Sequence, residues 1–220
     1  MEGHRVALCA ERLRRLDGST AIMETMTDID WTAGSWTTEP AHVALADDGL
    51  RVTAVETSDA WRITSYGFIH DTEHALLAPF EQDTAMEVSF QLDFSGQFDQ
   101  AGIFVKVDDV TWIKAGVELS DGEESLGAVV TRDVSDWSLS PVPDWSGRNV
   151  TIRASRSGNA LTVRARVDGE PWRLVRVAPL DPDAVVGAGP MCCAPSRGDL
   201  TVHFTSWRTE PADVSLHPQD

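Results

Sequence analysis

The residues of this sequence most able to do chemistry lie on two neighbouring strand-like segments. In residues 112–118, apolar side chains alternate with Trp112, Lys114 and Glu118, which therefore share the face opposite the core. On the preceding strand-like segment the same alternation places Gln100 on that face if the two segments pair as a hairpin. An indole stacks on the apolar face of a pyranose, while ammonium, carboxylate and amide groups bond its hydroxyls. The pattern therefore favours a small carbohydrate or sugar-derived metabolite as the ligand.

The same face admits two other interpretations. Gly102 and Gly116 would keep its floor low for a ligand, but the face could also be solvated, with Lys114 and Glu118 pairing only with each other. Such an exposed ion pair contributes about 0–1 kcal/mol. An enzyme acting on a saccharide would instead use Lys114 and Glu118 as an acid/base pair, with His74 assisting.

Two further segments add candidates for ligand binding. The first contains Trp61 and, after it, the run from His70 to His74, whose two histidines could be read as metal ligands. Because this run lies among strands and turns rather than on a helix, we expect no metal there, and His74 to fix a turn or line a cleft. The second contains Asp136 and Trp137, and Trp137 either overhangs the ligand face or packs in the core.

Signatures of catalysis are missing from the sequence. It contains no nucleophile elbow, no P-loop and no dinucleotide-binding fingerprint. The alternating carboxylates of laminarinase-like enzymes are absent too, since the run from Glu118 to Glu124 is typical of a turn. Retaining hydrolysis needs two carboxylates about 5–5.5 Å apart, and Glu118 has no evident partner. We expect no catalytic residues and no cofactor.

Strands must position these side chains. Apolar residues occupy every second position in the segments 86–94 and 101–107, and again in 150–152 and 161–167 on the two sides of a turn at 157–159. Residues 201–207 form a last strand-like segment. Beyond residue 22 no helical period persists, so the pattern predicts an all-β sandwich or barrel. We expect one domain over residues 27–210, a disordered or mis-assigned extension at 1–26 and a flexible tail at 211–220.

Composition limits the partners. The formal net charge of −17 disfavours nucleic acid and anionic membranes, both of which attract basic surfaces. The adjacent Cys192 and Cys193 are poorly placed for a disulfide, and the sequence shows neither a secretory signal nor a long apolar run. A cytoplasmic location is the expectation.

Several motifs together resemble a known family. The chain is similar, over residues 30–208, to the regulation-of-enolase-protein family, a family of unknown function in the concanavalin A-like lectin/glucanase superfamily. The resemblance implies a jelly-roll sandwich of two antiparallel sheets, and it adds Asp99 to the candidate ligand residues, but it implies little about activity. The motifs that carry it are Asp59-Ala60-Trp61, Tyr66-Gly67-Phe68 with Asp71 and His74, Asp99-Gln100-Ala101-Gly102-Ile103, the run Trp112 to Glu118 with Asp121-Gly122, Val129 to Arg132, Ser135 to Ser138, Val186-Gly187, and Cys192 to Pro195.

Three hypotheses about function follow from these observations. The first is a binding module for a small carbohydrate or metabolite, using Asp99, Gln100, Trp112, Lys114 and Glu118 with Trp61, His74, Asp136 and Trp137. The second is a regulatory protein that contacts metabolic enzymes, through a protein partner or as a homodimer. The third is the saccharide-acting enzyme described above.

Overall fold

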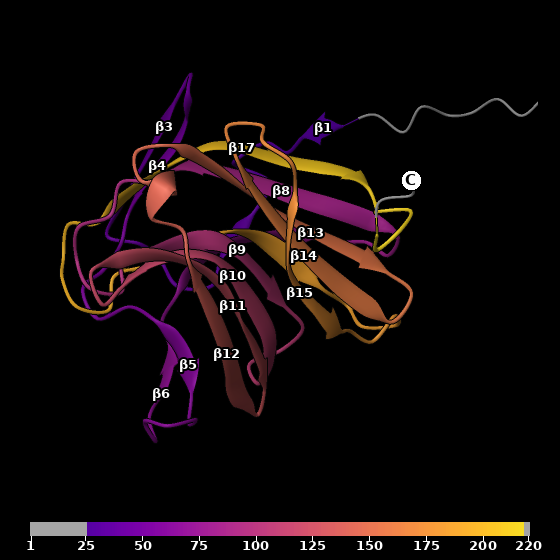
Figure 1. Cartoon of the computed structure of the whole chain (residues 1–220), viewed down its shortest axis with the longest axis horizontal. Coiled ribbons are helices and arrows are strands. Elements are labelled where there is room, and N and C mark those ends of the chain that lie inside the picture. Colours follow the sequence, from indigo (N-terminus) through magenta and orange to yellow (C-terminus); the bar gives the residue numbers. More distant parts are fainter. Residues whose placement is uncertain (1–25, 218–220) are drawn as a thin grey trace, which may run out of the picture.

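Two antiparallel sheets packed face to face make up the chain (Figure 1). The structure is a computed structural model and describes residues 26–217. A short hairpin of β5 (Ala60–Arg62) and β6 (Ile69–Asp71) projects from the sandwich at the lower left of Figure 1. A single turn of 3₁₀-helix, η1 (Pro143–Trp145), connects the sheets. The predicted sandwich of two antiparallel sheets is confirmed.

One sheet has eight strands, in the order β15-β14-β13-β8-β17-β4-β3, with β1 pairing with β17. Its strands are β1 (Thr27–Asp28), β3 (His42–Ala46), β4 (Gly49–Thr53), β8 (Thr84–Gln91), β13 (Asn149–Ser157), β14 (Ala160–Val167), β15 (Arg173–Pro179) and β17 (Thr201–Pro211).

The other sheet has seven strands, in the order β12-β11-β10-β9-β16-β7-β2. Its strands are β2 (Ser35–Trp36), β7 (His74–Pro79), β9 (Gln100–Lys106), β10 (Thr111–Ser120), β11 (Glu123–Arg132), β12 (Val134–Pro141) and β16 (Gly187–Cys193).

The core lies between the sheets and follows the alternation in the sequence. Phe90 and Ile152 of the eight-stranded sheet face Ile103 and Ile113 of the seven-stranded sheet, and all four belong to one buried cluster. Full burial of such a side chain contributes about 1.5–3 kcal/mol. Since every second residue of β8, β9, β10 and β13 enters this core, the intervening residues must face outward.

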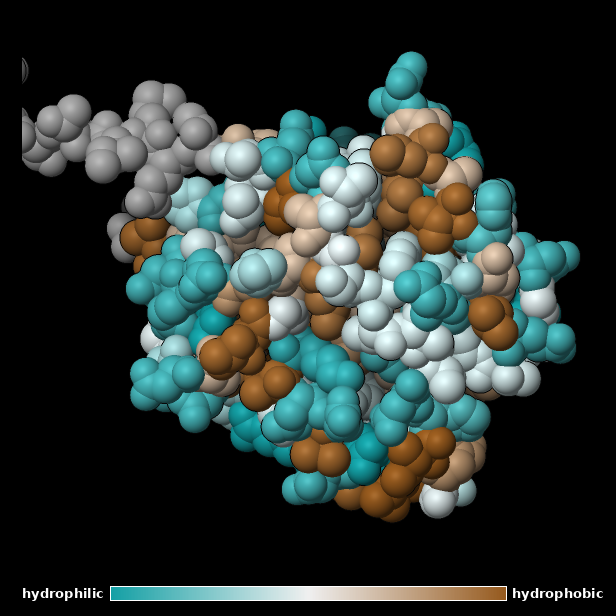
Figure 2. Space-filling view, turned by 180° about the vertical axis from the view of Figure 1, so that it is seen from behind, coloured by the Kyte–Doolittle hydropathy of each residue, from teal (hydrophilic) through white to brown (hydrophobic). Residues whose placement is uncertain are grey.

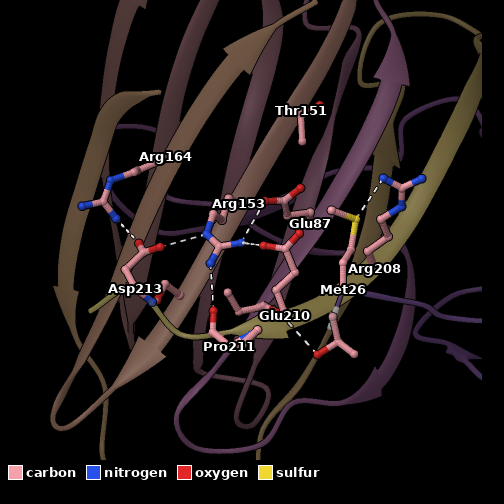
Figure 3. A network of polar contacts seen from close by, with 12 residues as sticks. Met26, Glu87, Thr151, Arg153, Arg164, Arg208, Glu210, Pro211 and Asp213 are labelled. Atoms are coloured by element: carbon pink, nitrogen blue, oxygen red, sulfur yellow. Dashed lines mark hydrogen bonds and ion pairs between the residues drawn. The ribbon is translucent and has the colours of Figure 1, made fainter. Parts of the chain in front are cut away.

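The outer face of the eight-stranded sheet is more buried than the alternation predicts. Glu87 on β8 is buried because Arg153 on β13 covers it and donates a hydrogen bond of 2.8 Å to its Oε1. Figure 3 shows Arg153 surrounded by Glu87, Glu210 and Asp213, and its Nε donates to Asp213 Oδ1 at 2.9 Å. Arg164 pairs with Asp213 from the other side.

These contacts also concern the chain ends. Asp213 is held by two arginines, so the region expected to be a flexible tail is tied to the sheet at its beginning. Of the extension expected at residues 1–26, only Met26 lies within the described residues, and residues 218–220 lie outside them too.

Among residues 26–217, no helix is long and apolar enough to cross a membrane.

Candidate ligand-binding site

The candidate site lies on the outer face of the seven-stranded sheet, where β9 and β10 pair as predicted. The antiparallel register places Lys114 opposite Phe104 and Glu118 opposite Gln100. The turn Asp121-Gly122 then joins β10 to β11, and both residues have positive φ angles, 54° and 85°. A two-residue turn of this kind matches the twist of the strands and fixes their register, and with it the position of Glu118.

Glycines form the floor of this face. Gly116 pairs with Gly102 on one side and with Gly127 on the other. A Cβ atom on Gly102 or Gly116 would lie 2.0 Å from a backbone oxygen of the neighbouring strand, so no larger residue fits either position. The low floor predicted from Gly102 and Gly116 is therefore present, and Gly127, which the sequence analysis did not single out, extends it.

Beside this floor is a pocket of about 500 Å³. A cavity of this size is typical of small-molecule sites. Five of the predicted ligand residues line it together: Trp61, Gln100, Lys114, Glu118 and Trp137. The pocket is completed by Thr57, Asp59, Tyr66, Phe68, His70, Phe98, Val129, Pro195 and Ser196.

Lys114 is the centre of the polar side of the pocket. Its buried Nζ donates to Asp59 Oδ1 at 2.9 Å and to Gln100 Oε1 at 2.8 Å. Burial opposes the charged ammonium, but Asp59, with smaller contributions from Cys193 and Glu118, outweighs it and raises the pKa of Lys114. Lys114 is therefore a fixed cation, and the interpretation in which it pairs only with Glu118 on a solvated face is wrong.

Glu118, unlike Lys114, has a polar atom that residues 26–217 leave without a partner. Its Oε1 is buried and has no hydrogen-bond partner among the described residues. Burial raises the pKa of Glu118 to about 7; nearby Lys114 lowers it, while Asp59 and Asp121 raise it further. A buried acceptor without a donor is costly, so a ligand that supplies a donor would relieve this cost.

Aromatic side chains line the rest of the pocket beside these polar groups and form its aromatic wall. Trp61 on β5 contacts Tyr66 with ring centroids 5.6 Å apart and Trp137 on β12 with centroids 6.0 Å apart, both edge to face. The Trp61 indole donates to the carbonyl of Thr64 at 3.0 Å, which fixes the ring on the hairpin. Trp137 is 39% exposed, which fits the prediction that it overhangs the face rather than the alternative of core packing.

The nine residues that complete the pocket were not predicted as ligand residues, and four of them, Asp59, Tyr66, Phe68 and His70, carry polar or aromatic groups that a ligand could contact. Tyr66, Phe68 and His70 alternate in the sequence, so a period of two was a usable signal that they share a face. Nothing local pointed to Asp59, because its partner Lys114 is 55 residues away in the sequence.

Trp112 does not line the pocket, and its predicted role as the stacking platform needs correction. It is 3% exposed and stacks on Phe104, with ring centroids 5.3 Å apart. Both rings belong to a small apolar cluster with Trp61, because the β5–β6 hairpin packs over this end of the sheet. Trp61 and Trp137 line the pocket instead, and Trp137 is the more exposed of the two, at 39% compared with 7% for Trp61.

His74 also lies outside the pocket, where the structure gives it a backbone role. Its buried ring accepts a hydrogen bond from the Val55 amide at Nε2, 3.0 Å away, and its Nδ1 lies 3.0 Å from the Thr38 carbonyl. Burial lowers the pKa of His74, and the contact with Thr38 offsets part of this effect. His74 therefore cannot assist Lys114 and Glu118, and the interpretation that it fixes a turn is the one that fits.

Asp99 and Asp136 are likewise engaged elsewhere. Asp99 is fully buried, pairs with Arg197 at 2.6 Å and accepts hydrogen bonds from the amides of Ser95 and Gly96. Asp136 points away from the pocket and pairs with Arg176 at 2.9 Å. Within residues 26–217, no group of three or more His, Cys, Asp or Glu side chains could hold a metal ion.

Two packed antiparallel sheets with a lined pocket on one outer face define a β-sandwich protein. The chain belongs to the family described as a protein of unknown function (DUF1349), whose model matches residues 36–212. It is 36% identical over 185 residues to "Regulation of enolase protein 1" of Saccharomyces cerevisiae, which covers 84% of this chain and 93% of that protein.

Solved structures share the fold. A functionally unknown protein from Saccharomyces cerevisiae matches with a TM-score of 0.79 and 33% identity, over 85% of this chain and all of that one. A xylan β-1,4-xylosidase from Bacillus halodurans matches with a TM-score of 0.62 and 16% identity, over 84% of this chain and 38% of the enzyme. At that identity the likeness to the xylosidase concerns the fold alone.

Proposed function

We propose that the protein binds a small carbohydrate or sugar-derived metabolite in the pocket between the seven-stranded sheet and the β5–β6 hairpin. The observation that carries the proposal is that polar and aromatic groups line the same 500 Å³ pocket. Gln100, Lys114 and Glu118 offer the polar groups, and Trp61 and Trp137 offer the rings. A sugar ring has the same two characters, hydroxyls at its edge and C–H groups on its faces.

A calorimetric and thermal-shift screen of mono- and disaccharides against the wild type tests this proposal. Trp137→Ala removes an exposed ring of the pocket at little cost to the core, and we expect it to weaken the best ligand about tenfold. Trp172→Ala is the matched control, because it removes a half-buried indole that does not line the pocket. Binding by none of the sugars, or equal binding by wild type and Trp137→Ala, would contradict the proposal.

One observation favours a saccharide-acting enzyme as a second candidate. The pKa of Glu118, raised to about 7, suits a general acid or base at neutral pH. Lys114, held protonated by Asp59, would then stabilise negative charge rather than accept a proton. Turnover of aryl glycosides that disappears in Glu118→Gln and persists in Glu123→Gln would support this candidate.

The surface of the hairpin favours a protein partner as a third candidate. Ile63 and Ile69 of the hairpin and Val134 at the start of β12 are exposed, and Figure 2 shows hydrophobic surface gathered at its lower right, where the hairpin lies. Partner capture with wild type and with Ile63→Ser/Ile69→Ser, two exposed positions, tests it. A partner retained equally by both proteins would exclude this surface.

A further inference from the structure

We propose that the ligand is a sugar-derived amine whose protonated amino group pairs with Glu118. This inference rests on the pocket being the ligand site proposed above and narrows the class of ligand that it accepts.

The hydrogen-bonding groups of the pocket show what a ligand must supply. Two of the three N–H groups of Lys114 are already given to Asp59 and Gln100. The amide of Gln100 is committed as well, since its Nε2 donates to the Phe98 carbonyl at 3.3 Å. Glu118 Oε1, in contrast, is buried without a donor. Of the polar groups around Lys114 within residues 26–217, Glu118 Oε1 is the buried one left without a partner, so a ligand with an N–H or O–H group directed at this oxygen fits the pocket.

Charge narrows the choice further. The pocket contains two carboxylates, Asp59 and Glu118, against the single ammonium of Lys114, and no arginine lines it. A phosphate or carboxylate on the ligand would add negative charge beside Glu118 without a free cation to receive it. An ammonium would balance the charge of Glu118, and the net charge of −17 favours the approach of cations to the protein.

The aromatic wall also suits a cation. The ring of Trp61 stands at 68° to Tyr66 and at 86° to Trp137, so the rings form a corner rather than a flat platform. Aromatic faces attract ammonium groups, and the attraction strengthens where water is displaced. A ligand with both a polyol frame and an amine would use the carboxylate and this corner together.

Matched ligand pairs test the inference by calorimetry. Glucosamine, galactosamine and N-methylglucamine are each compared with the parent glucose, galactose or sorbitol, and with N-acetylglucosamine and glucose 6-phosphate. At pH 7.5 we expect at least one amine to bind the wild type about tenfold or more tightly than its uncharged counterpart. This preference for the amine should disappear in Glu118→Gln. It should remain in Glu123→Gln, the control, because Glu123 is exposed and does not line the pocket.

A pH series adds a second readout. The pKa of Glu118 is about 7 without ligand, so the carboxylate fraction rises about tenfold between pH 6 and pH 8. The affinity of N-methylglucamine, whose alkylamine stays protonated over this range, should rise about tenfold in wild type and stay constant in Glu118→Gln.

The outcomes separate this inference from the proposed function. Uncharged sugars or the sugar phosphate binding as tightly as the amines would overturn the inference and leave the proposed function standing. A preference for amines that survives in Glu118→Gln would overturn the role of Glu118. If no amine, sugar or phosphate binds the wild type, both proposals fail.

Discussion

Each sheet of the sandwich buries a cation on its outer face, and the two cations have different surroundings. Arg153 on the eight-stranded sheet meets three carboxylates, Glu87, Glu210 and Asp213, and every one of them is paired (Figure 3). Lys114 on the seven-stranded sheet meets Asp59, while Glu118 beside it keeps a buried oxygen without a donor.

We infer that the difference separates a structural network from the binding site proposed above. Around Arg153 the chain satisfies its own charges, so the arrangement holds the C-terminal segment on the sheet and leaves nothing for a ligand. Around Lys114 the polar groups are positioned but not all satisfied, and an aromatic wall encloses them. Unsatisfied buried polar groups in a lined pocket are what a binding site needs. Four substitutions test this comparison.

Arg153→Met should have the largest effect on stability. It removes the hydrogen-bonded partner of the buried Glu87 and leaves it with Arg166, whose nitrogen lies 3.9 Å from Glu87 Oε2. We expect the free energy of unfolding in urea to fall by about 3–5 kcal/mol. Arg51→Met removes an arginine whose ion pair with Asp48 is exposed, and it should unfold close to wild type. A loss below about 1 kcal/mol for Arg153→Met would mean that the network around Glu87 is not a stabilising one.

Lys114→Met should cost less, about 2–3 kcal/mol, because Asp59 retains access to water and can be rehydrated. The side chain of Asp59 is 18% exposed, compared with 6% for Glu87. Lys106→Met, on the neighbouring strand and paired with an exposed carboxylate, is the control. A loss of stability equal to that of Arg153→Met would show that the network around Lys114 is as well shielded from water as the network around Arg153.

Glu118→Gln should stabilise the protein in a manner that depends on pH. The pKa of Glu118 rises from an ordinary 4.5 to about 7 on folding, so the folded state holds the proton more tightly than the unfolded state. Wild-type stability therefore falls as pH rises from 4.5 to 7, and the glutamine variant escapes this loss. Between pH 4.5 and pH 8, we expect the difference in unfolding free energy between Glu118→Gln and wild type to change by about 1–3 kcal/mol in favour of the variant.

Urea unfolding at pH 4.5, 6, 7 and 8 measures this difference. Glu123→Gln is the control, because the Glu123 side chain is exposed on the same strand pair and should give a difference that does not change with pH. If the difference in unfolding free energy between Glu118→Gln and wild type did not change with pH, the Glu118 carboxyl would be hydrated in the folded state. The contrast between an unsatisfied Glu118 and a fully paired Glu87 would then be lost.

Asp136→Asn should have the smallest effect. Its carboxylate is 68% exposed and pairs with Arg176 on the surface, so we expect a change in unfolding free energy within about 0.5 kcal/mol. Ligand binding should be unchanged, whereas Trp137→Ala, one residue further along β12, should weaken it about tenfold. Weaker binding by Asp136→Asn would restore Asp136 to the site predicted from the sequence.

The fold could be read from the sequence because its information is local. Alternation with a period of two in residues 86–94 and 112–118 fixes which side chains enter the core, and turn residues such as Asp121-Gly122 fix where strands reverse. The same rule placed Lys114 and Glu118 on one outer face, and the register of β9 with β10 confirms it.

The site could be read only in part. Alternation places Trp112 and Lys114 on the same face but does not tell which of them a later layer covers. The β5–β6 hairpin covers Trp112 and leaves Lys114 lining the pocket. His74 and Asp99 do not line the pocket, because backbone and arginine partners from distant segments engage their polar groups.

The sequence by itself therefore determined the two-sheet sandwich, the face that carries the polar residues and the glycine floor between them. The tertiary structure alone decided that Asp59 neutralises Lys114, that Trp61 and Trp137 form the wall, and that Glu118 is left with a buried oxygen in need of a donor. The physical reason is the sequence separation over which each feature is determined. The pleat of a strand is set by neighbouring residues, whereas the pairing of a buried charge depends on which distant segment the fold brings beside it.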